Sequence, residues 1–466
     1  MSIRSAGGRP MGKKSKLPMS AVEEPLAEWR FPQPVFQMVL HPERPMLLCG
    51  LADGHVYCYS YDAARLQQTL AENKKQRDRD GQQSLWTCVE AGDEESPEGV
   101  RLEWRTRRHR GSVRCMCLDA DGTYVYSVGT DNVLKKARSD TGKVVQKVTL
   151  REQTCGFTKM AKSATHAYLL LGDEDGNVTV VNSETLKRTN RIVKIHGGDA
   201  INDIFQFAKR SVHKYISLGQ TTLAYWDARE CGDDDAKRKV VVSDNQEDEM
   251  LCGAFVDPEA GDTVVCGMGE GVLTVWKPNK NDLEDQMNRI KICQNESVDC
   301  VVPTLQDDDA VWCGCSDGKI YKADVKRGRV VEVRTHSDDD EVTFIDLDYE
   351  YRVVSGGMDK IVLWQSIDEK DASSSESDAE QAPTAESDND VSSDAEITDD
   401  SSSDSEDGTV LVGLSREELI AELDKDLAGD DTDEQKPEEP RKNKNKKRKL
   451  AGKQASSHGI AKFEGL

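Results

Sequence analysis

Leu48-Cys-Gly-Leu-Ala-Asp-Gly-His-Val-Tyr-Cys-Tyr59 is the first of three closely similar stretches in this sequence. The other two are Val311-Trp-Cys-Gly-Cys-Ser-Asp-Gly-Lys-Ile-Tyr321 and Val353-Val-Ser-Gly-Gly-Met-Asp-Lys-Ile-Val-Leu-Trp364. Each stretch contains a short apolar run, a tight Asp-Gly or Asp-Lys turn, and a second run of alternating side chains. This arrangement predicts a β-hairpin.

Weaker copies of the same turn bring the total to seven, and they occur at Asp131-Asn132, Asp175-Gly176, Gln220-Thr221 and Glu270-Gly271. From the second turn to the seventh the spacings are 44, 45, 50, 47 and 42 residues. A period in the forties with four strands per repeat is typical of WD-repeat β-propellers. The sequence therefore predicts an all-β fold, a seven-bladed WD-repeat propeller over residues 28–367.

Blades one and seven depart from the regular repeat. Turn-to-turn spacing rises to 78 residues across blade one, which indicates a charged insertion over residues 63–99. The fourth strand of blade one is then Val100–Arg107. Blade seven lacks a fourth strand of its own, and an unpaired sheet edge is a liability. We expect Glu28-Trp-Arg-Phe-Pro to close the ring, preceded by a disordered arm over residues 1–27.

The tail, residues 368–466, is predicted to be disordered. Its block 371–407 contains fourteen acidic residues, eleven serines and no Lys or Arg, and it cannot bury enough apolar surface to offset chain entropy. Seven serines have an acidic residue three positions on, as acidophilic kinases prefer. These phosphorylation candidates are Ser373, Ser375, Ser377, Ser387, Ser393, Ser401 and Ser403.

Two further features stand in the tail. A capping box predicts a short helix over residues 415–428, whose apolar stripe consists of Leu419, Leu423 and Leu427 and could bind a partner. A basic run follows, and in an exposed tail such runs are read by nuclear import receptors. Its basic members are Arg441, Lys442, Lys444, Lys446, Lys447, Arg448 and Lys449. Together with the acidic block, this run predicts a nuclear and nucleolar protein.

The candidate catalytic and metal-binding motifs of the sequence are incomplete. Gly7-Gly-Arg-Pro-Met-Gly-Lys13 resembles a phosphate-binding loop, but Lys14 stands where a Ser or Thr should hold magnesium. The thirteen cysteines lack the Cys-x-x-Cys pairs of zinc sites, so we interpret them as buried, reduced side chains. His109 and His336 precede Asp131 and Asp359 at the spacing of a structural hydrogen-bond network. We predict no enzyme, no cofactor and no metal.

Partner binding is the remaining function, and one cluster stands out. Six arginines fall within fourteen residues, opposed only by Glu103: Arg101, Arg105, Arg107, Arg108, Arg110 and Arg114. Their centre is a connection between blades, which in a propeller opens on the face where partners usually dock. The cluster could meet RNA phosphate or an acidic protein surface. The alternative is an ordinary solvated strand. The net charge of −24 argues against indiscriminate binding to nucleic acid.

Three segments resemble the nucleolar WD repeat-containing protein 55 family and its fungal JIP-type counterparts. They are Glu296-Ser-Val-Asp-Cys-Val-Val-Pro303 with the Cys313–Tyr321 stretch after it, Arg107-Arg-His-Arg-Gly-Ser-Val-Arg114, and the terminal Ala461-Lys-Phe-Glu-Gly-Leu466. The resemblance implies a non-enzymatic nucleolar scaffold in ribosomal RNA production and large-subunit biogenesis. It also implies ribosome-assembly proteins as partners, while RNA contact stays open. We expect a monomeric propeller with no membrane association.

Two alternative functions remain open. Trp226-Asp227-Ala228-Arg229 matches a box found in substrate receptors of cullin-type ubiquitin ligases, although the same residues also end ordinary WD strands. A chromatin-binding propeller is equally compatible with the fold. The proteins that co-purify with the chain would separate these alternatives: pre-ribosomal proteins, a ligase adaptor or histones.

Overall fold

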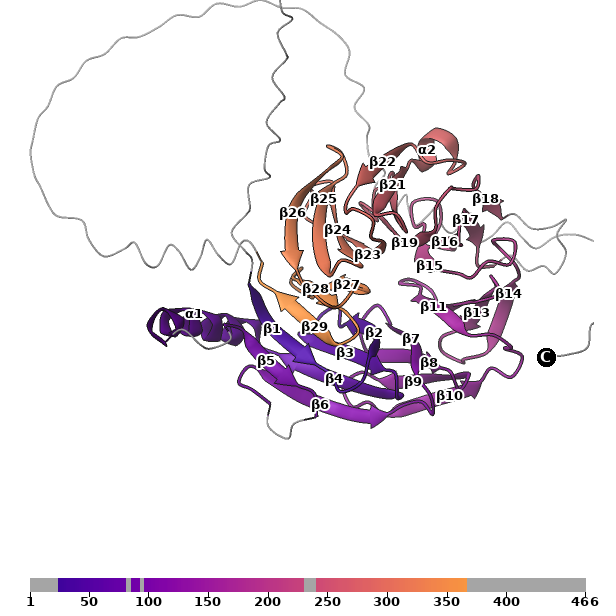
Figure 1. Ribbon diagram of the computed structural model, residues 1–466. Coiled ribbons are helices and arrows are strands. Elements are labelled where there is room, and N and C mark those ends of the chain that lie inside the picture. The colour runs from indigo at the N-terminus through magenta and orange to yellow at the C-terminus, as the bar shows by residue number, and fades with distance from the viewer. Residues whose placement is uncertain (1–23, 81–84, 93–95, 230–239, 367–466) are drawn as a thin grey trace, which may run out of the picture. The chain divides into compact units, whose positions relative to one another are not determined.

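The computed structural model describes residues 24–80, 85–92, 96–229 and 240–366. In these ranges seven sheets, all antiparallel except for one added parallel strand, are arranged as the blades of a propeller, which confirms the predicted fold class (Figure 1). In six of the blades the first strand along the chain lies nearest the centre of the ring, and later strands lie progressively outward. The seventh blade differs because the N-terminal strand joins it.

Blades one to three are built in chain order. Blade one consists of β2 (Val35–Leu40), β3 (Met46–Leu51), β4 (His55–Tyr61) and β6 (Val100–Arg107). Blade two consists of β7 (Val113–Leu118), β8 (Tyr124–Gly129), β9 (Val133–Arg138) and β10 (Val144–Thr149). Blade three consists of β11 (Phe157–Lys162), β12 (Tyr168–Asp173), β13 (Val178–Asn182) and β14 (Arg188–Ile192).

Blades four to six repeat the pattern. Blade four consists of β15 (Asp203–Gln206), β16 (Lys214–Leu218), β17 (Leu223–Asp227) and β18 (Val241–Val242). Blade five consists of β19 (Met250–Phe255), β20 (Val264–Met268), β21 (Val272–Trp276) and β22 (Asn288–Lys291), with the short helix α2 (Pro278–Asn281) between its last two strands. Blade six consists of β23 (Val298–Pro303), β24 (Ala310–Cys315), β25 (Lys319–Asp324) and β26 (Arg329–Thr335).

The glycine that precedes each turn explains why the repeated stretch is so constant. A Cβ atom on Gly50 would lie 2.6 Å from Cγ1 of Val113, at the start of the next blade. The same conflict would arise between Gly267 and Val298, and between Gly314 and Val342. Successive blades therefore approach each other where the second strand has no side chain, and the apolar core is shared between neighbours.

The ring closes through the N-terminal strand, as predicted. Blade seven contains β27 (Phe344–Leu347), β28 (Val353–Gly356) and β29 (Lys360–Trp364), to which β1 (Pro25–Arg30) is added in antiparallel pairing. Leu26, Ala27 and Trp29 are buried, so the strand begins at Pro25 and not at the predicted boundary of residue 28.

The blade-one insertion is more ordered than its charged composition suggests. The sequence predicts a charged loop, but the structure shows the helix α1 (Ala63–Asp80) and the strand β5 (Thr87–Glu90). Asp62 caps the helix by accepting a hydrogen bond from the backbone nitrogen of Arg65 (3.1 Å), and Leu66 and Leu70 are buried against the core. β5 pairs in parallel with β1, so blade seven has five strands (Figure 1).

Candidate partner-docking surface

The predicted arginine cluster spreads over three positions of the fold. Arg101, Arg105 and Arg107 lie on β6, the outermost strand of blade one, and all three are exposed. Arg110 is exposed in the connection that leads to blade two. Arg114 is exposed on β7, the innermost strand of blade two. The structure therefore separates Arg114 from the rim.

Alternation along β6 determines which of its arginines are available. Glu103 neutralises Arg101, because the Nη2 of Arg101 lies 2.6 Å from the Oε2 of Glu103. The Arg105 guanidinium lies 5.0 Å from the centre of the Tyr57 ring, a cation–π contact. Within the described residues, Arg105, Arg107 and Arg110 form no ion pair through their side chains. We call these three residues the arginine rim.

Arg108 does not belong to this surface, contrary to the prediction. Only 3% of the residue is exposed, and its guanidinium lies 5.4 Å from the ring of Trp104. Its Nη2 donates to the backbone oxygen of Gly142 (2.9 Å), and burial lowers its pKa to about 10. Arg108 therefore connects blade one to blade two.

A buried histidine holds the loop that carries Arg110. The Nδ1 of His109 lies 2.9 Å from Oδ1 of Asp131, and its Nε2 lies 2.9 Å from the hydroxyl of Ser127. The other Asp131 oxygen accepts a hydrogen bond from the backbone nitrogen of Arg110 (3.2 Å). Burial lowers the pKa of His109 to about 4, so the network holds a neutral imidazole at physiological pH. The structural interpretation of this histidine is confirmed.

The corresponding network of blade seven differs from the prediction. His336 bonds to the hydroxyl of Ser355 (2.8 Å), which also accepts a hydrogen bond from the Trp364 indole (2.8 Å). Asp359 is not its partner. The backbone nitrogen of Asp359 donates to Asp340, and its backbone oxygen accepts from the ring-closing segment at Phe31. In blade seven, Ser355 near the end of the second strand thus bonds to the histidine Nδ1, as the turn residue Asp131 does in blade two.

Blade four satisfies its histidine without a carboxylate. His196 contacts the hydroxyl of Thr222 (2.8 Å) and the hydroxyl of Ser217 (2.9 Å). Trp226 also donates to Ser217 (3.0 Å), and Arg229 forms a two-point ion pair with Asp227 at 3.0 and 2.8 Å. The Trp-Asp-x-Arg box therefore has a structural role within its own blade.

The cysteines, like the histidines, are structural side chains. The described cysteines form no disulfide, and burial raises the pKa of several thiols, including that of Cys115 to about 12. Among the described residues no group of three or more His, Cys, Asp or Glu side chains could hold a metal ion. None of the helices in the described ranges is long and apolar enough to cross a membrane.

Two carboxyl groups on innermost strands, Asp299 on β23 and Asp346 on β27, have raised pKa values of about 6. Asp346 lies on β27 and is partly buried. Burial raises its pKa to about 6, and the neighbouring charge of Asp348 acts in the same direction. A hydrogen bond from the backbone nitrogen of Leu347 (2.9 Å) and the charge of Lys159 act in the opposite direction. The ionised form is therefore less favourable in the folded protein than in the unfolded chain.

Asp346→Asn is expected to stabilise the protein at about pH 8 by roughly 1–2 kcal/mol, and to have little effect near pH 4. Because the folded-state pKa is raised, the cost of ionisation is fully present above about pH 6 and disappears below the unfolded value near 4. Urea unfolding at the two pH values measures the difference. Asp338→Asn makes the same charge change on an exposed residue and serves as the control. An equal effect of Asp346→Asn at both pH values would contradict this account.

The remaining predicted site residues lie outside the described ranges. This applies to the three leucines 419, 423 and 427, to the seven basic residues of 441–449, and to the seven serines of 371–407. The sequence analysis missed two groups within the described part. One is the insertion, signalled by Asp62 and the leucines four residues apart. The other is a basic groove between blades two and three.

The geometry and the comparisons define a WD-repeat β-propeller. Residues 102–135, which run from β6 into β9, match the family described as "WD domain, G-beta repeat". The chain is 53% identical to WD repeat-containing protein JIP5 of Eremothecium gossypii, over 98% of this chain and all of the relative. It is 48% identical to that of Vanderwaltozyma polyspora over the same shares, and 49% identical to that of Saccharomyces cerevisiae over 83% of this chain and 85% of the relative. The chain belongs to the JIP5 family of WD repeat-containing proteins.

Proposed function

We propose that this protein is a non-enzymatic nucleolar scaffold that acts in ribosomal RNA production and large ribosomal subunit biogenesis. The JIP5 family and the WD-repeat propeller support the scaffold part of this proposal. The resemblance to the WD repeat-containing protein 55 family supports the ribosomal part. Its partners would be proteins of pre-large-subunit particles.

The arginine rim carries the proposal of how such a partner binds. Arg105, Arg107 and Arg110 are exposed and free of carboxylate partners within the described residues, in a chain whose net charge is −24. Guanidinium groups form two-point hydrogen bonds with carboxylates and phosphates, so the rim suits an acidic protein surface or RNA phosphate. His109 and Asp131 fix the loop that presents Arg110, so little ordering is needed on binding.

Depletion of the protein is expected to lower the ratio of large to small ribosomal subunits and to cause precursor RNA to accumulate. Sucrose-gradient profiles and precursor RNA blots measure both effects. Re-expression of the triple variant Arg105→Glu, Arg107→Glu and Arg110→Glu should fail to restore the ratio. Its stability should stay within about 1 kcal/mol of the wild type, because exposed charges contribute little to folding.

A matched reversal on other blades controls for net charge: Arg289→Glu, Lys280→Glu and Lys326→Glu in one chain. This control should restore the ratio fully. Full rescue by the arginine-rim variant would place the docking site elsewhere on the ring. Normal subunit ratios after depletion would overturn the ribosomal proposal and favour the ligase-receptor or chromatin alternatives.

Nuclear import is proposed to depend on the basic run of the tail. Replacing Lys446, Lys447, Arg448 and Lys449 with Ala is expected to move a tagged protein from the nucleus to the cytoplasm, because import receptors recognise clustered positive charge. Fluorescence microscopy of the tagged variant makes the measurement. Unchanged nuclear accumulation would exclude this run as the main signal.

A further inference from the structure

A groove of about 440 Å³ opens between blades two and three, and none of its lining residues belongs to the arginine rim. One side is formed by the outer strand β10 and the connection that follows it. The other side is formed by β13 and β14. Val148, Leu150 and Leu186 contribute apolar side chains to its lining.

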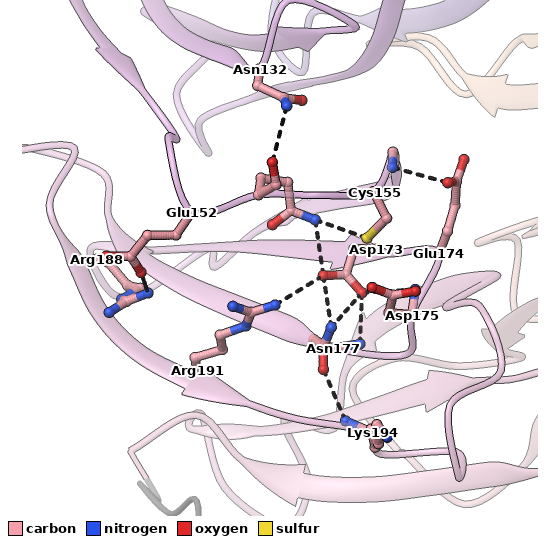
Figure 2. Close-up of polar contacts among 12 residues, drawn as sticks. Asn132, Glu152, Cys155, Asp173, Glu174, Asp175, Asn177, Arg188, Arg191 and Lys194 are labelled. Carbon is pink, nitrogen blue, oxygen red and sulfur yellow. Dashed lines mark hydrogen bonds and ion pairs between the residues drawn. The ribbon is translucent and has the colours of Figure 1, made fainter.

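The charges that line this groove are mainly positive. Arg151, Lys187, Arg188 and Arg191 face a single carboxylate, Glu152. Arg188 forms an ion pair with Glu152, whose side chain is 72% exposed (Figure 2). The groove is thus a local excess of positive charge on an acidic protein. Glu152 shows that a carboxylate can reach the Arg188 guanidinium.

Among the described residues, the Arg191 side chain is paired only by a long contact. Its Nη2 lies 3.6 Å from Oδ2 of Asp173 (Figure 2). Asp173 is only 1% exposed, and it already accepts hydrogen bonds from the side chains of Gln153 and Asn177, both at 3.0 Å. The backbone nitrogens of Asp175 and Asn177 also donate to it.

The Nε of Arg191 is therefore buried without a hydrogen-bond partner among the described residues. A buried charged donor without an acceptor is costly. The Arg191 side chain as a whole is 28% exposed, so an anion bound in the groove can approach its guanidinium.

The groove adjoins a free sheet edge. β10 is the last strand of its sheet, so its outer backbone groups pair with none of the described strands. Val144 and Val145 on this strand are 40% and 50% exposed, as valines on the outer strands β18 and β26 also are, and Val148 and Thr149 line the groove itself. Such an edge accepts an extended segment of another chain by backbone hydrogen bonding.

We propose that this groove binds an extended acidic segment of a partner protein. Carboxylates of that segment contact Arg188 and Arg191, an aliphatic side chain packs on Val148 and Leu150, and its backbone pairs with β10. This surface is separate from the arginine rim, and the inference does not depend on the proposed ribosomal function.

A protein segment suits the groove better than RNA does. Recognition of single-stranded RNA generally uses exposed aromatic rings on which bases stack. Phe157 is the aromatic residue of the groove lining, and it is only 3% exposed. The apolar lining instead matches an aliphatic side chain, and the free edge of β10 matches a polypeptide backbone.

The test uses the full chain and a short fluorescein-labelled peptide in which leucine and glutamate alternate, with affinity measured by fluorescence polarisation. Reversal of two neighbouring exposed cations, Lys187→Glu with Arg188→Glu, should weaken binding about tenfold or more, since charge-assisted hydrogen bonds are lost. Arg289→Glu with Lys280→Glu is the matched control, because it also reverses two exposed cations. Arg289 lies on β22, the outer strand of blade five, and its side chain is 48% exposed against 46% for Arg188. This control should bind like the wild type.

Glu152→Gln tests the proposal more strictly than the reversals, because an increase in affinity is expected. Because Glu152 occupies the guanidinium that the ligand needs, its neutralisation should tighten peptide binding by about threefold. Arg191→Gln should weaken binding while the folded state, checked by circular dichroism, is retained. Weaker or unchanged binding in Glu152→Gln would overturn the proposal, as would equal affinity of the wild type and the double reversal. The proposal also fails if a labelled single-stranded RNA binds with the same dependence on these variants and the peptide does not.

Discussion

Deletion of residues 1–31 is expected to lower the free energy of unfolding by more than about 5 kcal/mol, or to prevent folding entirely. These residues include β1, which lies between β29 and β5 in the closing blade. Leu26 and Trp29 are 0% and 1% exposed, and each large apolar side chain removed from a core costs about 2–5 kcal/mol. The deletion also leaves two strand edges unpaired.

Deletion of residues 371–466 is the matched control. It removes three times as many residues but none of the described strands. We expect its melting temperature and its urea midpoint to equal those of the full chain. If both truncated proteins unfolded at the same urea concentration as the full chain, closure of the ring through β1 would not be needed for stability.

Excision of the blade-one insertion is expected to cost about 3–5 kcal/mol of stability while the propeller still forms. Tyr61 and Val100 are directly paired across β4 and β6, so an Asn-Gly turn can replace residues 63–99 without moving either strand. The loss arises because Leu66, Leu70 and Val89 pack against the ring-closing strand and its surroundings.

A single substitution tests the same contact with less disturbance. Trp86 donates a hydrogen bond from its indole nitrogen to Glu28 of β1 (3.2 Å). Trp86→Phe should lower stability by about 1 kcal/mol, a hydrogen-bond-sized effect, whereas the excision should lower it several-fold more. Urea unfolding gives both numbers. Equal stability of the excised and full chains would mean that the insertion contributes nothing to closure.

The repeated turns predict most of the propeller because each one encodes a local structure. A tight turn between two apolar runs specifies a hairpin from a dozen residues, and the period places the next one. Closure by the N-terminal strand is also predictable, since blade seven lacks a strand and residues 28–32 have the right composition. The pairing of β5 with β1 is not predictable in this way. It joins residues some sixty positions apart through a strand of four residues, Thr87–Glu90.

The candidate site residues also divide into those that the sequence predicts and those that it does not. Exposure of Arg105 and Arg107 follows from strand alternation, but burial of Arg108 depends on Trp104 and on the turn of the next blade at Gly142. Both contacts lie between blades, which a period along one chain does not describe. The basic groove was missed for the same reason: its arginines come from β14 and from the connection between blades two and three, and only the fold brings Arg151 and Arg188 to one groove.

The parallel pairing of β1 with β5 has a consequence for the order of synthesis. β1, α1, β5 and blade one all lie within residues 25–107, so they can assemble soon after the chain leaves the ribosome. One edge of β1 is then paired with β5, and its other edge is unpaired. This second edge can pair only after β29, which ends at Trp364, has been translated. The insertion thus gives the newborn chain an early template on which its last blade is completed, and the template is unprotected for most of translation.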